Sequence, residues 1–311
     1  MSHEASSGRH GDALAGRVTA SYGRNYEIVV APDTPDREVL KCVARGKRHA
    51  YACGDQVRIE RTSPNQGVIV ALDTRRNLLW RSDAFRQKLI AANLTQIVIV
   101  VATEPGFSPL FISRCIVAAE SEGLATVIVL NKADLADRLD AARAQLAPFS
   151  KLGYPIVETN ALGDLTKLTR RLAGQRSILV GQSGMGKSTI TNTLIPEAQA
   201  VTAEISTVLD SGKHTTTFAR LYEFEGGWII DSPGMQAFGL AHVSTDALLE
   251  AFVEFRPHLG QCRFRDCRHD AEPGCGLRTA LEADEIDPLR FIHFHTIRAE
   301  IESAERQSRG W

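Results

Sequence analysis

Residues 181–189 read Gly181-Gln182-Ser183-Gly184-Met185-Gly186-Lys187-Ser188-Thr189, and they directly follow the short apolar run 177–180. This is the full strand, G-x-x-x-x-G-K-[ST], helix pattern of a phosphate-binding P-loop. The glycines let several backbone N–H groups point at one phosphate chain, and the helix that starts near Lys187 adds its positive end. We expect Lys187 to reach the β- and γ-phosphates and Ser188 to contact Mg²⁺. The alternative is a glycine-rich turn without a ligand.

The composition indicates a globular chain of two or three domains. The chain has 311 residues, 43% of them hydrophobic, and a formal net charge of −1, so any basic surface for nucleic acid must be local. No charged and apolar leader opens the sequence, and the longest strongly apolar run, residues 97–102, is too short to span a bilayer. We therefore expect a cytoplasmic protein without membrane contact.

The N-terminal quarter of the chain predicts a small β-barrel. Residues 1–13 lack periodicity and are expected to form a disordered tail. Residues 14–75 contain short alternating runs between turn residues, which is typical of a barrel. The basic loop Arg45 to Tyr51 could pair phosphates and stack its ring on a base, as loops of OB-type barrels do, or be a solvated hairpin tip. The expected strands are 16–19, 26–31, 39–43, 56–60 and 67–71.

Residues 76–240 alternate between strand and helix patterns, which predicts a doubly wound α/β sheet. Residues 75–92 are expected to be a linker followed by a helix. Segments 216–224 and 228–231 are expected to pair as a hairpin. Residues 241–311 are expected to form a third, helical domain, with helices over 245–255 and 288–305. In the α/β part the expected strands are 97–102, 126–130, 154–159 and 177–180, and the expected helices are 109–122, 135–152, 165–172 and one after Lys187.

A second nucleotide motif is Asn131-Lys132-Ala133-Asp134, directly after the expected strand 126–130. A carboxylate can accept hydrogen bonds from both the ring N–H and the exocyclic amino group of guanine, which adenine does not offer. We therefore expect these residues to select guanine, with a chance surface turn as the alternative.

Two weaker motifs complete a GTPase set. In Asp231-Ser232-Pro233-Gly234, Asp231 is expected beside Mg²⁺ through a water, and the Gly234 N–H near the γ-phosphate. In the run 212–217, Gly-Lys-His-Thr-Thr-Thr, Thr215 or Thr216 is expected to complete the magnesium shell. The position where many GTPases carry a water-orienting glutamine is Met235, so we favour His214 for holding the attacking water.

The order of these motifs is circularly permuted, because residues 131–134 precede the P-loop by about fifty residues. The chemistry is unaffected, since every motif follows a parallel strand and the carboxyl ends of such strands share one edge. The segment 231–239 then runs directly into the C-terminal domain. We expect γ-phosphate contacts to set the position of that domain, and the loop 45–51 to bind rRNA in either nucleotide state.

The C-terminal domain carries a metal-ligand pattern, C-x4-C-x-H-x5-C, formed by Cys262, Cys267, His269 and Cys275. Three thiolates and one imidazole suit a tetrahedral structural Zn²⁺, and four protein ligands leave no open position for catalysis. Buried free thiols are the alternative. The other three cysteines are scattered, which does not suit a disulfide framework.

Together these features resemble the RsgA (YjeQ) family of ribosome small-subunit-dependent GTPases over nearly the whole chain. The resemblance implies an OB-type β-barrel, a circularly permuted GTPase domain and a helical zinc domain. It implies GTP or GDP with Mg²⁺, one structural Zn²⁺, and contacts with the 30S subunit and its 16S rRNA. GTP hydrolysis stimulated by the subunit would assist late maturation and control release. We further expect a monomer that works beside other assembly factors.

Two positions depart from the family pattern, and two other functions stay open. Thr159-Asn160-Ala161 stands where an S-A-type turn supports guanine, so Asn160 must make its contact another way, and Ser232 replaces a threonine. A P-loop nucleotide kinase would give no reason for the N-K-x-D motif. An RNA-binding protein with a vestigial nucleotide site would show no GTP turnover with small subunits.

Overall fold

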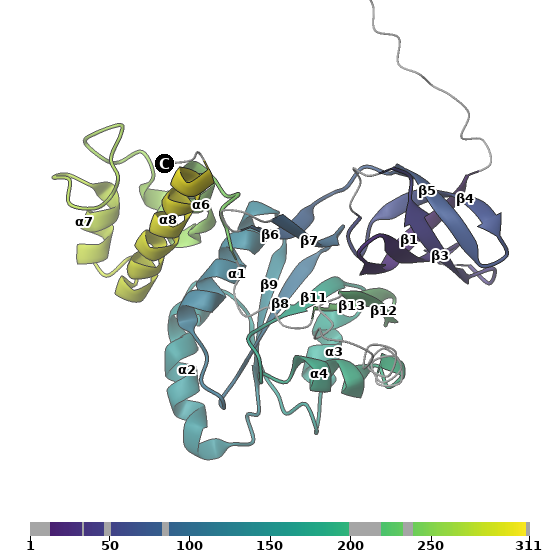
Figure 1. Ribbon diagram of the computed structural model, residues 1–311. Coiled ribbons are helices and arrows are strands. Elements are labelled where there is room, and N and C mark those ends of the chain that lie inside the picture. Colours follow the sequence, from purple (N-terminus) through teal and green to yellow (C-terminus); the bar gives the residue numbers. More distant parts are fainter. Residues whose placement is uncertain are drawn as a thin grey trace, which may run out of the picture.

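The computed structural model describes residues 13–32, 34–46, 51–82, 87–198, 219–232 and 239–308. A β-barrel lies at one end of the molecule, an α/β sheet in the middle and a group of helices at the other end (Figure 1). This arrangement confirms the predicted fold class. The predicted tail, apart from residue 13, and loop residues 47–50 lie outside the described part. Within that part, no helix is long and apolar enough to cross a membrane.

The N-terminal barrel closes because its fourth strand pairs back to its first. The strand order is β1-β2-β3-β5-β4, β1 also pairs with β4, and β3 runs parallel to β5. Alternate residues such as Val18, Ile28, Leu40 and Ile59 are fully buried and fill the interior. The five strands lie where the alternation predicts them. They are β1 (Leu14–Tyr22), β2 (Asn25–Val30), β3 (Glu38–Ala44), β4 (Gln56–Ser63) and β5 (Gln66–Leu72).

The central sheet has the order β10-β9-β8-β11-β13-β12, and of these described strands β12 alone runs antiparallel to its neighbour. Its edge strand β12 also meets β1 of the barrel, at the pair Ala20 and Arg220. The strands are β8 (Gln96–Ala102), β9 (Ala125–Asn131), β10 (Ile156–Glu158), β11 (Arg176–Val180), β12 (Arg220–Phe224) and β13 (Gly227–Asp231).

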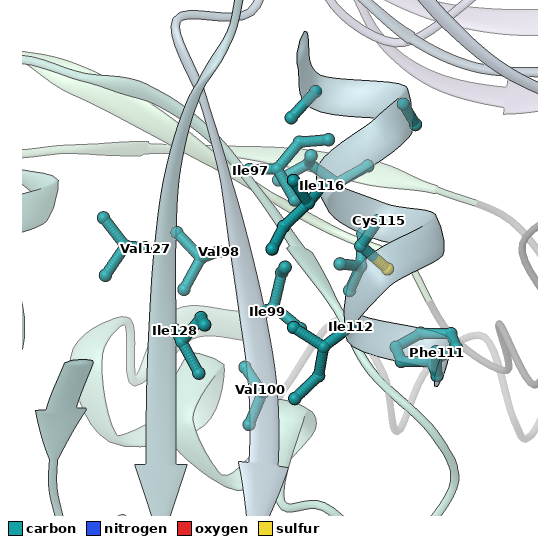
Figure 2. Close-up of a cluster of buried hydrophobic side chains, with 14 of the residues drawn as sticks. Ile97, Val98, Ile99, Val100, Phe111, Ile112, Cys115, Ile116, Val127 and Ile128 are labelled. Carbon is teal, nitrogen blue, oxygen red and sulfur yellow. The ribbon is translucent and has the colours of Figure 1, made fainter. Parts of the chain in front are cut away.

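Helices cover both faces of this sheet, so its central strands are largely buried and mostly apolar. All seven residues of β8 are buried. Figure 2 shows Ile97 and Ile99 of β8 facing Ile112 and Ile116 of α1. The helices α1 and α2 lie on one side of the sheet and α3 and α4 on the other (Figure 1), as right-handed crossovers require. Their bounds are α1 (Pro109–Ser121), α2 (Ala136–Lys151), α3 (Thr166–Leu172) and α4 (Lys187–Leu194).

The helix expected within residues 75–92 is wrong. The segment forms a hairpin of β6 (Leu78–Ser82) and β7 (Gln87–Ala92). The segment is held extended by Cys53 of the barrel, because the Ala92 N–H donates to the Cys53 carbonyl at 2.8 Å and Ala91 pairs with Cys53. Long-range pairing thus overrides the helix propensity of Leu, Lys, Gln and Ala in this segment.

The C-terminal part is helical, as expected, but its elements are shorter and more numerous. The helix expected over 245–255 ends at 251 and continues as a 3₁₀ turn that contains Pro257, whose ring cannot extend an α-helix. A further short helix was not expected from the sequence. The elements are α6 (Thr245–Ala251), the 3₁₀ helix (Val253–His258), α7 (Gly276–Glu282) and α8 (Pro288–Ser308).

A buried polar cluster joins α8 to α1, which packs on the central sheet. The Arg290 guanidinium, fully buried, donates from Nε to Glu254 Oε1 at 2.7 Å and from Nη1 to Ser113 Oγ at 2.7 Å. Ser113 Oγ also lies 2.8 Å from His293 Nδ1. Burial, with the nearby cations Arg290 and Arg114, lowers the pKa of His293 to about 4. The buried charge pair therefore joins α8 to the 3₁₀ helix, and Ser113 of α1 is held to α8 by hydrogen bonds with Arg290 and His293.

Candidate functional site

The P-loop lies between β11 and α4, at the carboxyl edge of the sheet. Two of its glycines cannot be replaced without movement of the backbone or of a buried neighbour. A Cβ at Gly181 would collide with the carbonyl oxygen of Val100, and one at Gly186 with the side-chain amide of Asn131. Gly186 also has a φ of +89°, which L side chains rarely adopt. The loop is therefore fixed in close contact with the neighbouring strands β8 and β9.

Lys187 and Asp231 form the charged centre of the loop. Lys187 is buried, and its Nζ donates to the carbonyl oxygens of Gly181 at 2.6 Å and Gln182 at 2.9 Å. Burial lowers the pKa of Lys187, and the nearby Asp231 opposes that shift. Burial raises the pKa of Asp231, with Lys187 opposing. Asp231 Oδ1 and Ser232 Oγ are buried and have no hydrogen-bond partner among the described residues. Such atoms call for a polar ligand or water.

Asn131 joins three loops at one point. Its Nδ2 donates to the Met185 carbonyl in the P-loop at 2.9 Å, and its Oδ1 accepts from the Ala161 N–H at 3.0 Å. The side chain is 1% exposed, so both bonds are shielded from water. The structure thus brings together the N-K-x-D segment, the P-loop and the Asn160–Ala161 turn, which lie far apart in sequence.

The remaining residues of the N-K-x-D segment are also held in place. Lys132 has a positive φ of 57°, and its Nζ donates to the Glu104 carbonyl at 2.6 Å. Thr103 Oγ1 donates to the Lys132 carbonyl at 2.9 Å. Asp134 is exposed, so its carboxylate is accessible to a ligand. Ala133 donates its N–H to the Thr159 carbonyl at 3.0 Å, which ties the segment to the end of β10.

The Asn160 side chain serves its own loop. Its Oδ1 accepts from the Leu162 N–H at 3.0 Å, which makes a short side-chain turn. The neighbouring Ala161 N–H is occupied by Asn131. In this structure the Asn160 side chain therefore stabilises its own turn, and the Ala161 N–H holds that turn against Asn131.

The four predicted metal ligands converge in the C-terminal domain. One donor atom from each of Cys262, Cys267, His269 and Cys275 lies within 4.8 Å of all the others. His269 Nδ1 is 3.5 Å from Cys262 Sγ and 3.4 Å from Cys275 Sγ. Zn–S bonds of about 2.3 Å in a tetrahedron place sulfur atoms about 3.8 Å apart. The donor set and its spacing therefore fit a structural Zn²⁺ bound through Nδ1 of the histidine.

The comparisons with known proteins agree with this geometry. The sequence model of the RsgA GTPase family matches residues 72–241, more than half of the chain. The chain belongs to the RsgA GTPase family. It is a GTPase of the RsgA type, with the permuted motif order and the N-terminal barrel expected from the sequence.

Relatives of this RsgA-family chain cover almost its whole length. A Burkholderia pseudomallei protein named Small ribosomal subunit biogenesis GTPase RsgA is 50% identical over 287 residues, 91% of this chain and 90% of that protein. A Ralstonia pickettii protein of the same name is 47% identical over 317 residues, 99% of this chain and 96% of the relative. The similarity to these relatives therefore extends along almost the whole chain.

Two solved structures share the fold. The crystal structure of YjeQ from Thermotoga maritima has a TM-score of 0.71 at 30% identity and covers 93% of this chain and 98% of that one. YloQ, described as a circularly permuted GTPase, has a TM-score of 0.69 at 23% identity and covers 95% of this chain and 98% of that one.

Some predicted site residues of this RsgA-family chain lie outside the described part. These are the run 212–217, with His214, Thr215 and Thr216, and also Gly234, so their roles stay predictions. Within the described part, a contact between Gln182 and α1 was not expected from the sequence. Gln182 Oε1 accepts from the Ser108 N–H at 3.1 Å, and Ser108 is the residue that caps α1. The P-loop thus touches the start of the helix on which the C-terminal domain packs.

The loop of the metal site is supported by α8, through residues that carry no motif in the sequence. Arg298 donates from Nη2 to both carboxylate oxygens of Asp270 at 2.8 Å and from Nη1 to the Arg268 carbonyl. His295 Nδ1 lies 3.0 Å from Asp270 Oδ1. Backbone N–H groups, including that of Arg268, lower the pKa of Glu272 to about 2. These contacts fix the backbone around His269.

Proposed function

We propose that this RsgA-family GTPase binds the 30S ribosomal subunit, assists its late maturation, and is released by GTP hydrolysis that the subunit stimulates. The observation that carries the proposal is the junction at Asn131, which ties the guanine-type N-K-x-D segment to the P-loop. The relatives' name, Small ribosomal subunit biogenesis GTPase RsgA, supplies the partner.

The proposed nucleotide site uses the residues at the carboxyl edge of the sheet. Asp134 would read the guanine edge, and the P-loop N–H groups and Lys187 would hold the phosphates. Ser188 would bind Mg²⁺, which bridges the phosphates and neutralises the charge of the transferring group. Asp231 would hold a water on that ion, and its buried Oδ1 without a described partner supports this role.

Water activation is proposed to depend on the run 212–217 and on Gly234. Thr215 or Thr216 would complete the magnesium shell, and the Gly234 N–H would contact the γ-phosphate. His214 would orient the attacking water through a ring nitrogen. The position after Gly234 carries Met235, whose thioether is only a weak hydrogen-bond acceptor, which supports the choice of His214.

The proposed Zn²⁺ is structural, held by three thiolates and one imidazole. Its contribution would be to fix the loop between the 3₁₀ turn and α7, which has little apolar core of its own. The barrel loop 45–51 and the C-terminal helices would contact 16S rRNA. We further propose that the protein acts as a cytoplasmic monomer beside other assembly factors.

The test of this function is nucleotide turnover measured with GTP and with ATP, each with and without purified small subunits. The proposal expects hydrolysis of GTP, weak hydrolysis of ATP, and a clear increase in GTP turnover on addition of subunits. Phosphate transfer to an acceptor other than water would support a nucleotide kinase instead. Undetectable GTP turnover with subunits present would support an RNA-binding protein with a vestigial site.

A further inference from the structure

An open basic groove runs along β10, the edge strand of the central sheet farthest from the barrel. It lies between α2, β10 and α3 and has a volume of about 920 Å³. One carboxylate, Glu158, faces five cations there, in a chain whose net charge is only −1. The groove is thus a local concentration of positive charge. Its cations are Arg143, Lys151, Lys167, Arg170 and Arg171.

The cations form two rows that flank the strand. Lys167, Arg170 and Arg171 are spaced i, i+3 and i+4 on α3 and therefore share one face of that helix. Arg143 and Lys151 lie eight residues apart on α2, about 12 Å along its axis. Two rows of this kind suit a chain of regularly spaced negative charges better than a single small anion.

Most of this charge is not neutralised by the residues that the structure describes. Arg143 is engaged, since its Nε and Nη2 donate to the two Glu158 oxygens at 2.6 and 2.8 Å and hold the pKa of Glu158 below its ordinary value. The exposed side chains of Lys151, Arg170 and Arg171 make no ion pair with any described residue. Asp164, just before α3, acts on the cations of that helix only at longer range.

The shape of the groove favours a phosphate backbone over an added peptide strand. The strand β10 has only three residues, and the Arg143–Glu158 pair crosses it, so an acidic peptide would find few free backbone groups for strand addition. Among the described residues no aromatic ring lines the groove, whose apolar floor includes Leu146, Ile156 and Val157. Base stacking is therefore not available from these residues, and contacts would be to phosphates.

We infer that this groove binds the phosphate backbone of RNA, as a contact surface separate from the barrel loop 45–51 and from the zinc-site helices. The identity of that RNA as rRNA of the small subunit rests on the proposed function. Binding is independent of base sequence and falls with salt. The groove lies along β10, which leads into the Asn160 turn and not into the loops that would contact the γ-phosphate. Its contribution to RNA binding is therefore the same with GTP and with GDP.

The test compares the triple variant Lys167→Gln/Arg170→Gln/Arg171→Gln and the single variant Lys151→Gln with the control Arg138→Gln. Arg138 is exposed, lies on another face of α2 and pairs with Glu104 outside the groove. Two probes are used, purified small subunits and an RNA duplex of about 16 base pairs, the length that a typical duplex-binding domain covers. Affinities are measured across a salt series with a non-hydrolysable GTP analogue and with GDP.

The triple variant is expected to bind both probes about tenfold or more weakly, and to lower the slope of log affinity against log salt by about 1 for each phosphate that the variant no longer neutralises. This weakening should be equal in the two nucleotide states, while GTP affinity and the Arg138→Gln control stay unchanged. If the triple variant is unfolded, Lys151→Gln alone tests the inference. It should lower the slope of log affinity against log salt by about 1.

Unchanged affinity and slope for the RNA duplex and the subunit overturn the inference. Unchanged RNA binding by the triple variant, together with weaker binding of an acidic peptide measured as a third probe, overturns it in favour of a peptide site. If the parent protein fails to bind subunits, the proposed function fails, but the duplex still tests the groove by the same change of slope.

Discussion

Replacement of Arg290 by Met should destabilise the C-terminal helices and remove one of their hydrogen bonds to α1, without touching the nucleotide site. The substitution removes the partner of Glu254, whose side chain is 3% exposed, and the hydrogen bond to Ser113. Removing one member of a buried ion pair costs about 3–5 kcal/mol, because the other charge stays buried without compensation. Both charges lie in the C-terminal helices, so a loss of about 4 kcal/mol lowers the equilibrium constant for folding of this part roughly 1,000-fold.

Two further variants separate this effect from simple loss of an arginine. The double variant Arg290→Met/Glu254→Leu removes both charges and should recover to within about 1 kcal/mol of the parent. Arg114→Met removes an exposed ion pair with Glu300 at the same interface and should cost less than about 1 kcal/mol. This control is matched to Arg290→Met in both the residue replaced and its location.

Urea unfolding and hydrogen exchange of α8 measure the stability of the docked state. We expect Arg290→Met to bind GTP normally but to lose most of the stimulation of its turnover by small subunits. The reasoning is refuted if Arg290→Met costs no more than Arg114→Met, or if the double variant is as unstable as the single one.

Four other results are expected. Asp134→Asn should lose GTP affinity and favour xanthosine triphosphate, because an amide can donate to the carbonyl that replaces the guanine amino group; competition binding of the two nucleotides checks this. Metal analysis should find about one zinc per chain. Cys267→Ser should make the C-terminal domain more susceptible to proteolysis while GTP binding persists. A parent protein that is folded without metal would contradict this prediction. His214→Ala should keep GTP affinity and lower turnover with subunits about tenfold or more, and equal rates in single-turnover assays would remove it from the mechanism. The pKa of His293 is about 4 in the folded state and about 6.5 in the unfolded state, so the folded protein binds fewer protons between these pH values. The free energy of unfolding is therefore retained above pH 6.5 and falls by about 2 kcal/mol at pH 5. His293→Gln should remove this part of the pH dependence of unfolding.

The sequence predicted that the N-K-x-D segment and the P-loop lie together because each of these two motifs follows a strand of strong pattern. The apolar runs within β8 and β9 could be recognised directly, and the carboxyl ends of parallel strands meet whatever their order in the chain. This is why Asn131 was placed with the P-loop although Met185 lies 54 residues away. The cluster of candidate zinc ligands was found for a similar reason, since the spacing of these residues is a local property.

Features decided by contacts between distant segments could not be predicted. The hairpin 78–92 contains good helix formers, and its strand state depends on Cys53 in the barrel. The cluster around Arg290 joins residues 177 positions apart, Arg290 and Ser113, and neither has a motif around it. A lone arginine in an amphipathic helix is normally solvated, and only the structure shows it buried.

The pairing of β12 with the barrel has a consequence for the order in which the chain folds during synthesis. β1 leaves the ribosome first, whereas its neighbour β12 follows about 200 residues later. Because domains fold as units from the N-terminus, the barrel closes on its own core early. The P-loop strand β11 then has β8 on one side but an open edge on the other until β13 emerges. The nascent GTPase is therefore most exposed to aggregation late in translation, beside the strand that carries its phosphate-binding loop.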